Sequence, residues 1–479
     1  MADTVTVLHR RSRLLLAGSA LALGACASVD PRTSLERAVD VPGRWQQGGA
    51  SPGSLDPVAL AAWWERFDDP ALNELIAGAL RTNPDVRTAL SKIAQYRALR
   101  GVQRGALFPA LTAGVAGSGT QVRGRNAAAT TNGSGTTESY SATLDASWEI
   151  DLFGAQRQTL AAASADLAQT AESFYGVEVT LAAEIATAYV NLRSAEAQLA
   201  VVQRSLGTRL ETVQLTQWRE QAGTGNALDT QQAVSLLEQA RAAIPTLQLS
   251  IAQTTNQLAS LAGRTPGALD ALLAAPHAIP AAPADIAFGI PAETLRQRPD
   301  VRAAERGVAA AFARTEAARR QRLPALSLTG SLGVEALRAR RLFTPDATIA
   351  SLLGSLTAPL FEAGRISATI TIQDELQKQS LIAYETTVLT ALSEVENALV
   401  AIRRHTERLA ALDRATAAAR EAATLAALQF QAGQVDLLVS LEAQRTLLDL
   451  EQQSVVTAAD RTADQIQLYK ALGGGWSHL

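Results

Sequence analysis

The sequence predicts an α+β membrane protein that combines very long coiled-coil helices with four membrane-spanning strands, arranged as two copies of one unit. Three observations lead to this prediction. The same short motifs occur twice, in the same order, at an offset of about 210 residues. Two proline-free segments carry apolar residues at a heptad spacing. Four shorter segments alternate between apolar and polar residues.

The N-terminus has the features of a secretory signal with a lipidation site. Three arginines precede an apolar run that begins at Leu14, and the run ends in the sequence Leu-Gly-Ala-Cys at 23–26. A run of about 14 residues is too short to span a bilayer and suits a cleaved signal peptide. Residues 1–25 are therefore expected to be removed, which leaves Cys26 for acylation. The alternative, a buried free cysteine in a cytosolic protein, does not account for the basic flank and the small residues.

Composition limits the class of protein. Cys26 is the only cysteine, so neither a disulfide framework nor a thiolate metal site is expected. Aromatic residues make up 4% of the chain and alanine is abundant, which favours closely packed helices over aromatic-rich cores. After residue 27 no run of 18 apolar residues occurs, so strands would have to cross any membrane. The net charge of −3 does not indicate a nucleic-acid binder, and no cofactor is expected.

The repeat divides the chain into two equivalent halves. Asn-Pro-Asp-Val-Arg at 83–87 returns as Arg-Pro-Asp-Val-Arg at 298–302, and Gln-Ala-Gly at 221–223 returns at 431–433. Each half is expected to hold a helix, two strands and a long helix pair. The expected segments are a signal peptide (1–25), a lipidated extension with a first helix (26–82), repeat 1 (83–263), a linker (264–297), repeat 2 (298–473) and a tail (474–479).

The longest helices are expected at residues 155–221 and 363–431, each followed by a shorter antiparallel helix, at 226–262 and 436–472. A helix of 67 residues or more extends about 100 Å, much more than the width of a globular domain. Apolar residues recur every seven positions, which predicts coiled-coil packing. These seam residues are Ile185, Leu192, Leu199, Leu206 and Val213, then Leu381, Val388, Val395, Ile402 and Leu409. Arg193 falls between seam positions and is expected to lie on a solvated face.

The alternating segments are expected to be strands with one apolar face. The clearest alternates without interruption from Ser139 to Asp151, with Tyr140 and Trp148 on the apolar side. The four segments are 111–122, 139–151, 326–336 and 350–360, and Leu353 breaks the pattern of the last. The segments between them, 123–137 and 337–348, are expected to be exposed hairpin loops.

The length and the number of these strands favour an outer-membrane barrel over a soluble β-sandwich. Each has about 10 to 13 residues, which suits a tilted membrane-spanning strand with its apolar side outward. Four strands cannot close a barrel, and in lipid each unpaired backbone group at an open edge would cost several kcal/mol. Several chains must therefore combine their strands. Two chains would give eight strands, and three would give twelve, which leave room for a pore.

Several motifs, each weak alone but specific together, are shared with one family. They are Cys26, the segment Trp63–Leu72, the duplicated Pro-Asp-Val, Leu152-Phe153-Gly154, the glycines at 223 and 433, and the segment Ala471–Trp476. In these residues the chain resembles the TolC-like outer-membrane channels of tripartite efflux pumps, in particular their lipoprotein branch. The resemblance covers nearly the whole mature chain.

The resemblance implies an assembly and a set of partners. It implies a homotrimer, lipid-anchored through Cys26, with a trimeric twelve-stranded β-barrel in the outer membrane. A long periplasmic α-helical coiled-coil barrel would continue it. A periplasmic membrane-fusion adaptor and an inner-membrane pump of the RND type would deliver small molecules to this passive conduit. In the family the tips of the helix pairs contact the adaptor, and Gly223 and Gly433 occupy those turns here.

Four acidic residues are candidate lining residues. Glu442 lies nine residues after the second helix tip, where the family commonly has a tunnel-lining aspartate at the constricted periplasmic end. The resemblance implies a ring of three carboxylates there, which would attract cations. The family often has a second acid where this chain has Val439, so the gate charge stays open, and an ordinary solvated glutamate is the alternative. Asp145, Glu149 and Glu335 fall on polar strand faces and are expected to line the barrel lumen.

Enzymatic activity is not expected. Of the four histidines only His405 is expected within regular structure, at a seam position where packing or a bond to a neighbour is the simpler role. We find no phosphate-binding loop, metal-ligand spacing or nucleophile pattern. Two alternatives to efflux stay open: a conduit for type I protein secretion, and a lipid-anchored periplasmic coiled-coil scaffold that does not conduct. Lipidation favours efflux, and a scaffold would not explain the strands.

Overall fold

The computed structural model describes residues 40–46, 60–122, 135–275, 277–281 and 291–476. Residues 41–479 form one compact unit, which holds all of the described helices and strands. Cys26 and the predicted signal peptide lie outside the described residues. Among the helices that are described, none has the length and apolar character of a membrane span.

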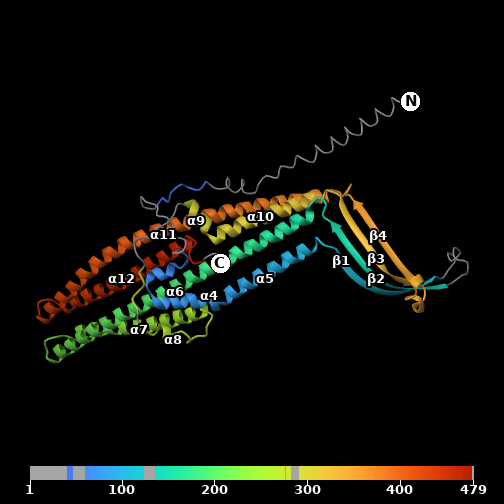
Figure 1. The fold of residues 1–479 in the computed structure, drawn as a ribbon. Helices are drawn as coiled ribbons and strands as arrows, with labels where there is room; N and C mark the ends of the chain where they lie inside the picture. The colour runs from blue at the N-terminus through green and yellow to red at the C-terminus, as the bar shows by residue number, and fades with distance from the viewer. Residues whose placement is uncertain (1–39, 47–59, 123–134, 276, 282–290, 477–479) are drawn as a thin grey trace. The chain divides into compact units, whose positions relative to one another are not determined.

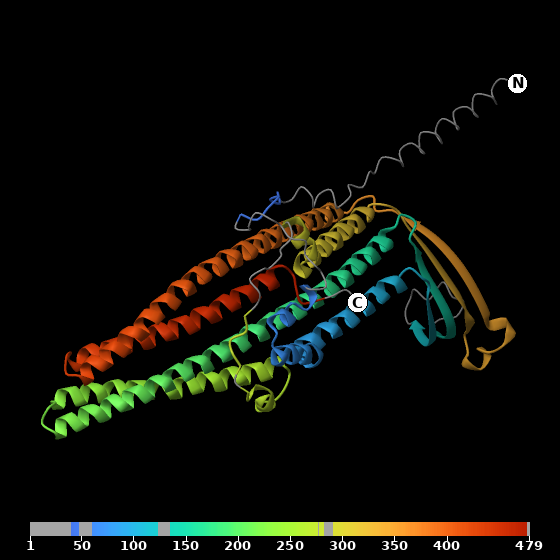
Figure 2. The same ribbon diagram turned by 60° about the vertical axis from the view of Figure 1, so that its left-hand side comes forward.

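The two longest helices of this unit have 67 residues each: α6, Ala155–Gln221, and α11, Arg365–Gln431 (Figure 1). Each turns back into a helix of 35 residues, α7 (Ala227–Leu261) or α12 (Leu437–Ala471). The four predicted long helices are thereby confirmed, and α7 continues through Pro245 without a break. Figure 2 shows the two antiparallel pairs side by side, with both tips at one end.

The shorter helices lie alongside the long helices, between the tips and the sheet (Figure 1). They are the 3-10 helix η2 (Trp63–Phe67), α4 (Pro70–Thr82), α5 (Pro84–Gly105), α8 (Asp270–Leu273), α9 (Pro291–Gln297) and α10 (Pro299–Arg320). Helices α5 and α10 are the equivalent members of the two repeats. Both begin at the proline of the duplicated Pro-Asp-Val motif, where a missing backbone N–H leaves no hydrogen bond unmade.

The residue before each Pro-Asp-Val holds the end of the returning helix. The side-chain nitrogen of Asn83 donates to the Leu261 carbonyl at 2.8 Å, and Arg298 donates to the equivalent Ala471 carbonyl at 2.9 Å. The glycine two residues after each carbonyl makes room for this contact. A Cβ at Gly263 would lie 2.6 Å from the Thr82 carbonyl oxygen, and one at Gly473 would lie 3.0 Å from Arg298 Cα. The duplicated motifs are therefore two copies of one packing contact.

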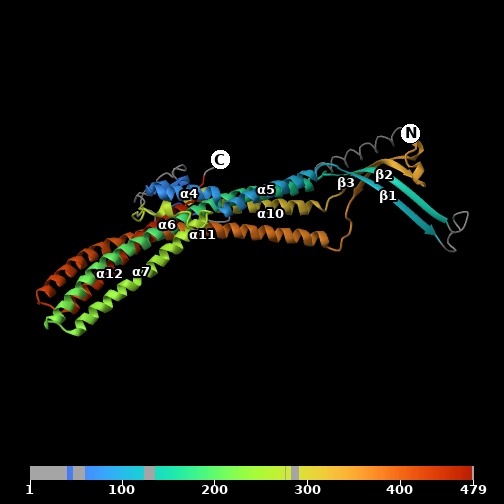
Figure 3. The same cartoon turned by 90° about the horizontal axis from the view of Figure 1, so that it is seen from below.

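The four predicted strands form one antiparallel sheet in the order β1-β2-β3-β4, which Figure 3 shows at the end opposite the helix tips. Their bounds are β1 Ala110–Val122, β2 Gly135–Ile150, β3 Ala325–Ala336 and β4 Thr348–Thr357. Pairing of β2 with β3 joins the two repeats, and β1 and β4 are the edges. Strand β4 ends three residues before the predicted end, since Pro359 has no N–H for a ladder.

The β3–β4 connection is more ordered than the expected exposed loop. It contains two short 3-10 turns, Ala339–Arg341 and Pro345–Ala347, and the side chains of Leu342 and Ala347 are buried. The expectation of a fully exposed loop is therefore wrong at these two positions, because apolar side chains in the turn pack inward. Most of the other predicted loop, 123–137, lies outside the described residues.

The core contains a compact aromatic cluster, which the low aromatic content did not predict. Trp63 is fully buried and stacks on Tyr469 with ring centroids 5.3 Å apart and an interplanar angle of 9°. Phe67 meets both rings edge-on. Tyr189 donates to the Asp69 carboxylate at 2.7 Å, and that carboxylate also caps α4. These aromatic rings join η2, α6 and α12.

Arg193 corrects a prediction about the long helix. It was expected on a solvated face, but its side chain is 0% exposed. Its guanidinium lies 4.8 Å from the Tyr189 ring centroid and donates to Glu196 at 2.7 Å and to the Leu273 carbonyl at 3.5 Å. The covering segment is α8 from the linker, which the heptad pattern could not include. A buried guanidinium is tolerated here because a carboxylate and an aromatic face accompany it.

His405 has the role expected from its seam position. Its Nδ1 lies 2.5 Å from Asp464 Oδ2, and both side chains are mostly buried between α11 and α12. Burial raises the pKa of Asp464, and the bond to His405 opposes that rise. This prediction of a partner-bonded histidine is confirmed.

Candidate functional site

Strand register places most of the apolar residues of the four strands on one face of the sheet. Successive partners across the sheet include the row Ala113, Leu144, Leu332 and Ala350 and the row Leu111, Ala146, Gly330 and Leu352. Leucines on this face are widely exposed, with Leu332 at 58% and Leu352 at 76%. An exposed apolar surface of this extent, made of alternate strand residues, has the character of a lipid-facing surface.

Two aromatic residues mark the ends of the apolar face. Tyr140 and Trp148 lie on it eight residues apart along β2, a separation of about 27 Å at the usual strand rise. That length is close to the roughly 25 Å apolar band of outer-membrane barrels, whose borders carry aromatic girdles. Trp148 Nε1 donates to the Leu107 carbonyl at 3.0 Å, and the Tyr140 hydroxyl donates to Glu138 at 3.4 Å. Each ring thus has a polar partner at one border of the band.

The opposite face carries the three acids proposed for the barrel lumen. Asp145 lies opposite Ser331, Glu149 opposite Ser327 and Glu335 opposite Ser141. The Asp145 carboxylate accepts from Thr143 at 2.8 Å, and the Glu335 carboxylate accepts from Ser139 at 3.1 Å. Ile349 and Leu353 in the edge strand β4 are large apolar exceptions on this face. The structure therefore brings the three acids onto one hydroxyl-rich surface.

The two helix tips have the same backbone geometry. Gly223 and Gly433 have φ of +71° and +74°, a region in which a side chain is strained. In each turn the next residue's N–H donates at 2.9 Å to a carbonyl five residues back, Thr224 to Arg219 and Gln434 to Gln429. This is the pattern of a glycine-terminated helix, and both turns are exposed.

Arg219 joins the two tips, a role that the sequence analysis missed. Its Nη2 donates to the carbonyl oxygens of Phe430 and Gln431, each at 2.9 Å, and its guanidinium lies 4.4 Å from the Phe430 ring centroid. The residue in the equivalent place of repeat 2 is Gln429. That break in the repeat is the signal that could have identified Arg219, since only one of the two tips can supply the link.

Glu442 lies on α12 and is exposed, but its charge is not isolated. Arg445 Nη2 lies 2.8 Å from Glu442 Oε1. Glu442 also lines a shallow groove of about 480 Å³ between α11 and α12, together with Leu438 and Val439. The pairing with Arg445 was not predicted from the sequence, and it neutralises part of the field that a ring of three Glu442 carboxylates would produce.

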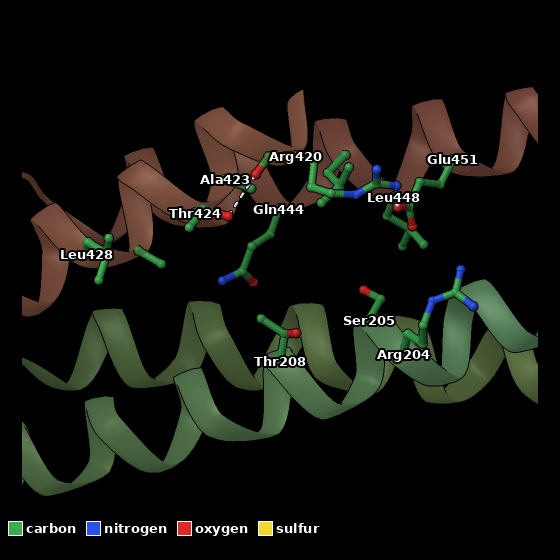
Figure 4. A pocket seen from close by; sticks show the side chains of 12 residues that line it. Arg204, Ser205, Thr208, Arg420, Ala423, Thr424, Leu428, Gln444, Leu448 and Glu451 are labelled. Atoms are coloured by element: carbon green, nitrogen blue, oxygen red, sulfur yellow. Dashed lines mark hydrogen bonds and ion pairs between the residues drawn. The ribbon is translucent and has the colours of Figure 1, made fainter. Parts of the chain in front are cut away.

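A second groove, of about 390 Å³, separates α6 from α11 and α12 at the junction of the two repeats (Figure 4). Arg204 and Thr208 line one side, and Gln444 projects from the other. Gln444 Nε2 donates to Thr212 Oγ1 at 3.3 Å, and this polar contact bridges the helix pairs. No cluster of three or more potential metal ligands occurs in the part of the chain that the structure describes.

Comparison with known proteins identifies the family. The model described as outer membrane efflux protein matches residues 75–264 and 290–474. The chain belongs to the outer membrane efflux protein family. The two matched segments correspond to the two repeats, and the family consists of transport channels rather than enzymes.

A toluene efflux pump outer membrane protein of Pseudomonas putida, TtgC, is 33% identical over 97% of this chain and 96% of its own length. The pyoverdine export outer membrane protein OpmQ of Pseudomonas putida is 30% identical over 97% of each chain. The efflux protein described here is thus an outer-membrane channel component of a tripartite efflux pump.

Solved channel structures confirm the predicted fold class. The outer-membrane channel OprN has a TM-score of 0.83 with 31% identity, covering 92% of this chain and 99% of OprN. The open state of the Neisseria gonorrhoeae MtrE channel has a TM-score of 0.78 with 30% identity, covering 91% of this chain and 96% of MtrE. The sheet belongs to the outer membrane and the helix pairs to the periplasm.

Proposed function

We propose that three copies of this chain assemble into one continuous conduit, anchored by lipid at Cys26 and docked through its helix tips to a periplasmic adaptor and an RND-type inner-membrane pump. The supporting observation is the sheet, which has an apolar face, a polar face and two open edges. Strand β4 of one copy would pair with β1 of the next, so that twelve strands close and no backbone edge meets lipid. The polar face, with Asp145, Glu149 and Glu335, would then line a water-filled lumen.

The proposed cargo is small organic molecules. The relatives are named for the efflux of toluene, solvents and antibiotics and for the export of pyoverdine. A passive conduit needs no binding pocket for each of these, because selection can occur before the cargo enters. This range of named cargo supports small-molecule efflux over protein secretion.

The deciding experiment is single-channel recording in planar bilayers with detergent-purified protein whose oligomer mass has been measured. A trimer that gives discrete conductance steps is the expected result. A Glu442→Ala variant is recorded in parallel. If the unaltered protein is silent, conductance by this variant would indicate a pore that is closed at its periplasmic end, and silence of both would indicate that no pore forms. If both the unaltered protein and the variant are monomers that do not conduct, the channel hypothesis is wrong and the lipid-anchored periplasmic scaffold is the alternative that stays open.

The adaptor contact leads to a prediction at the first tip. Gly223→Ala is expected to weaken binding of the adaptor about tenfold, since alanine at positive φ is strained by roughly 1–2 kcal/mol and the turn must rearrange. The matched control is Gly207→Ala in the middle of α6, and a Cβ at either glycine would meet no other group within 4 Å. Binding of the detergent-solubilised trimer to immobilised adaptor measures both. If the two variants bind the adaptor with equal affinity, the Gly223 tip is not part of the docking surface.

The ion pair near the second tip leads to a prediction about selectivity. Arg445→Gln leaves the carboxylates of a Glu442 ring uncompensated, so the ratio of K⁺ to Cl⁻ permeability is expected to rise on the order of threefold. Glu442→Gln should lower that ratio, and the double variant should return it toward the original value. Reversal potentials in a KCl gradient measure the ratio. Unchanged potentials in both single variants would place Glu442 away from the conduction path.

A further inference from the structure

The turn between β3 and β4 carries a concentrated positive charge. Between residues 337 and 347 there are three arginines, Arg338, Arg340 and Arg341, and one acid, Asp346, which gives a net charge of +2 in a chain whose total is −3. All three arginine side chains are exposed. Among the described residues none of these three arginines takes part in an ion pair, although most of the described ion pairs involve an arginine. These guanidinium groups are available to an external anion.

The turn holds the arginines in a defined arrangement. Arg341 N–H donates to the Arg338 carbonyl at 2.9 Å, and Thr344 Oγ1 donates to the Arg341 carbonyl at 2.8 Å. Beneath these bonds Leu342 and Ala347 are buried. A turn with its own hydrogen bonds and buried apolar side chains presents its charges at less entropic cost than an unstructured loop.

The register of the sheet sets the depth of the turn in the membrane. Tyr140, at one border of the apolar band, lies directly opposite Ala336 at the end of β3. Arg338 follows two residues later, about 7 Å further along the strand direction. The helix tips extend into the periplasm from the other end of the sheet, so this border faces the outer leaflet. The arginines therefore lie at the level of the outer-leaflet headgroups.

Apolar side chains accompany the charges. Phe343 is 84% exposed and Leu337 is 68% exposed, on either side of the arginines. A cluster of guanidinium groups flanked by exposed apolar side chains matches an amphipathic lipid, in which phosphate lies above acyl chains. If the turn lay in water at the mouth of the pore, nothing would offset the free-energy cost of exposing Phe343 and Leu337.

We propose that the Leu337–Ala347 turn is a binding site for phosphorylated lipid of the outer leaflet. Arg338, Arg340 and Arg341 bind the phosphate groups, and Phe343 and Leu337 contact the acyl chains beneath. Arginine suits this ligand because its planar fork donates two hydrogen bonds to one phosphate. This inference rests on the barrel proposed above. Binding at the turn would hold the outer end of that barrel to the surrounding lipid.

The test compares two variants with the same loss of charge, in detergent-purified trimer titrated with fluorescent lipid A that carries two phosphates. The loop variant is R338Q/R340Q/R341Q. The matched control is R403Q/R404Q/R408Q, which removes three exposed arginines from periplasmic α11. The loop variant is expected to bind at least about tenfold more weakly, and the control to stay within about twofold of the unaltered protein. Dephosphorylated lipid A should bind the unaltered protein as weakly as phosphorylated lipid A binds the loop variant.

Several results would overturn the proposal. They are equal binding by the loop variant, equal binding of dephosphorylated lipid A, and full displacement of lipid A by millimolar inorganic phosphate. A change of anion selectivity in the loop variant with unchanged lipid binding would instead place the arginines over the lumen. Conductance is recorded in a separate experiment. If the unaltered protein forms no channels in planar bilayers, the proposed function is contradicted, but the measured affinity for lipid A is unaffected.

Discussion

Leu332→Arg is expected to abolish insertion of the sheet into the outer membrane, whereas Ser331→Arg, one residue earlier, should leave insertion intact. The two side chains point to opposite faces of β3. Leu332 pairs with Leu144, midway between Tyr140 and Trp148, and so lies near the centre of the apolar band. Arginine at that depth costs about 2–4 kcal/mol in each copy, or roughly 6–12 kcal/mol in a trimer. Ser331 lies opposite Asp145 on the polar face, where a cation has a carboxylate partner.

Membrane fractionation followed by oligomer analysis distinguishes these two variants. Leu332→Arg should accumulate outside the outer-membrane fraction, and Ser331→Arg should yield normal amounts of outer-membrane trimer with altered ion selectivity. If both variants insert equally, or if Ser331→Arg is the defective one, the assignment of the lipid-facing and lumen-facing surfaces is wrong.

Trp63→Ala is expected to destabilise the helical part of each chain by about 3–5 kcal/mol, the range for removing a large aromatic side chain from a closed core. Trp63 is fully buried, stacks on Tyr469 and packs against Gly474, where even a Cβ would approach its ring within 3.0 Å. The segment just before η2 is tied to the C-terminal segment by the 3.0 Å hydrogen bond from the Gly475 N–H to the Leu60 carbonyl, which limits how far the backbone can move to fill the cavity.

The matched variant is Trp63→Phe, which keeps an aromatic face against Tyr469 and should lose less than half as much. Thermal unfolding of the helices, followed by far-ultraviolet circular dichroism on the detergent-solubilised trimer, compares both with the unaltered protein. An unfolding temperature of Trp63→Ala equal to that of the unaltered protein would mean that the aromatic cluster contributes little to stability.

Periodic features of this fold were predictable from the sequence, because one local rule governs each of them. The heptad spacing of residues such as Leu192 and Val395 predicts coiled-coil helices. The alternation from Tyr140 to Trp148 predicts a strand with one apolar and one polar face. Strand faces in turn predict that Asp145 and Glu335 share a surface. The first two inferences need only the residues within a single element, and the third also needs the pairing of β2 with β3.

Features that depend on contacts between distant segments were not predictable. Trp63 and Tyr469 are 406 residues apart in sequence (469 − 63) and meet only when the C-terminal helix returns to the first helices. Arg193 has the spacing of a solvated residue, and its burial comes from a short helix in the aperiodic linker. The break in the repeat marks Arg219 itself, but its acceptors on the other tip are main-chain carbonyls, which every residue has, so the sequence does not indicate them.

The open edges of β1 and β4 have a genetic consequence. Since no copy can complete the barrel alone, a chain that folds its helices but carries a defective strand can still join two normal copies. If half of the chains in a cell carry such a defect and mix at random, only about one trimer in eight contains three normal copies. A strand mutation such as Leu332→Arg should therefore be dominant when it is co-expressed with the normal gene, provided that its helices assemble.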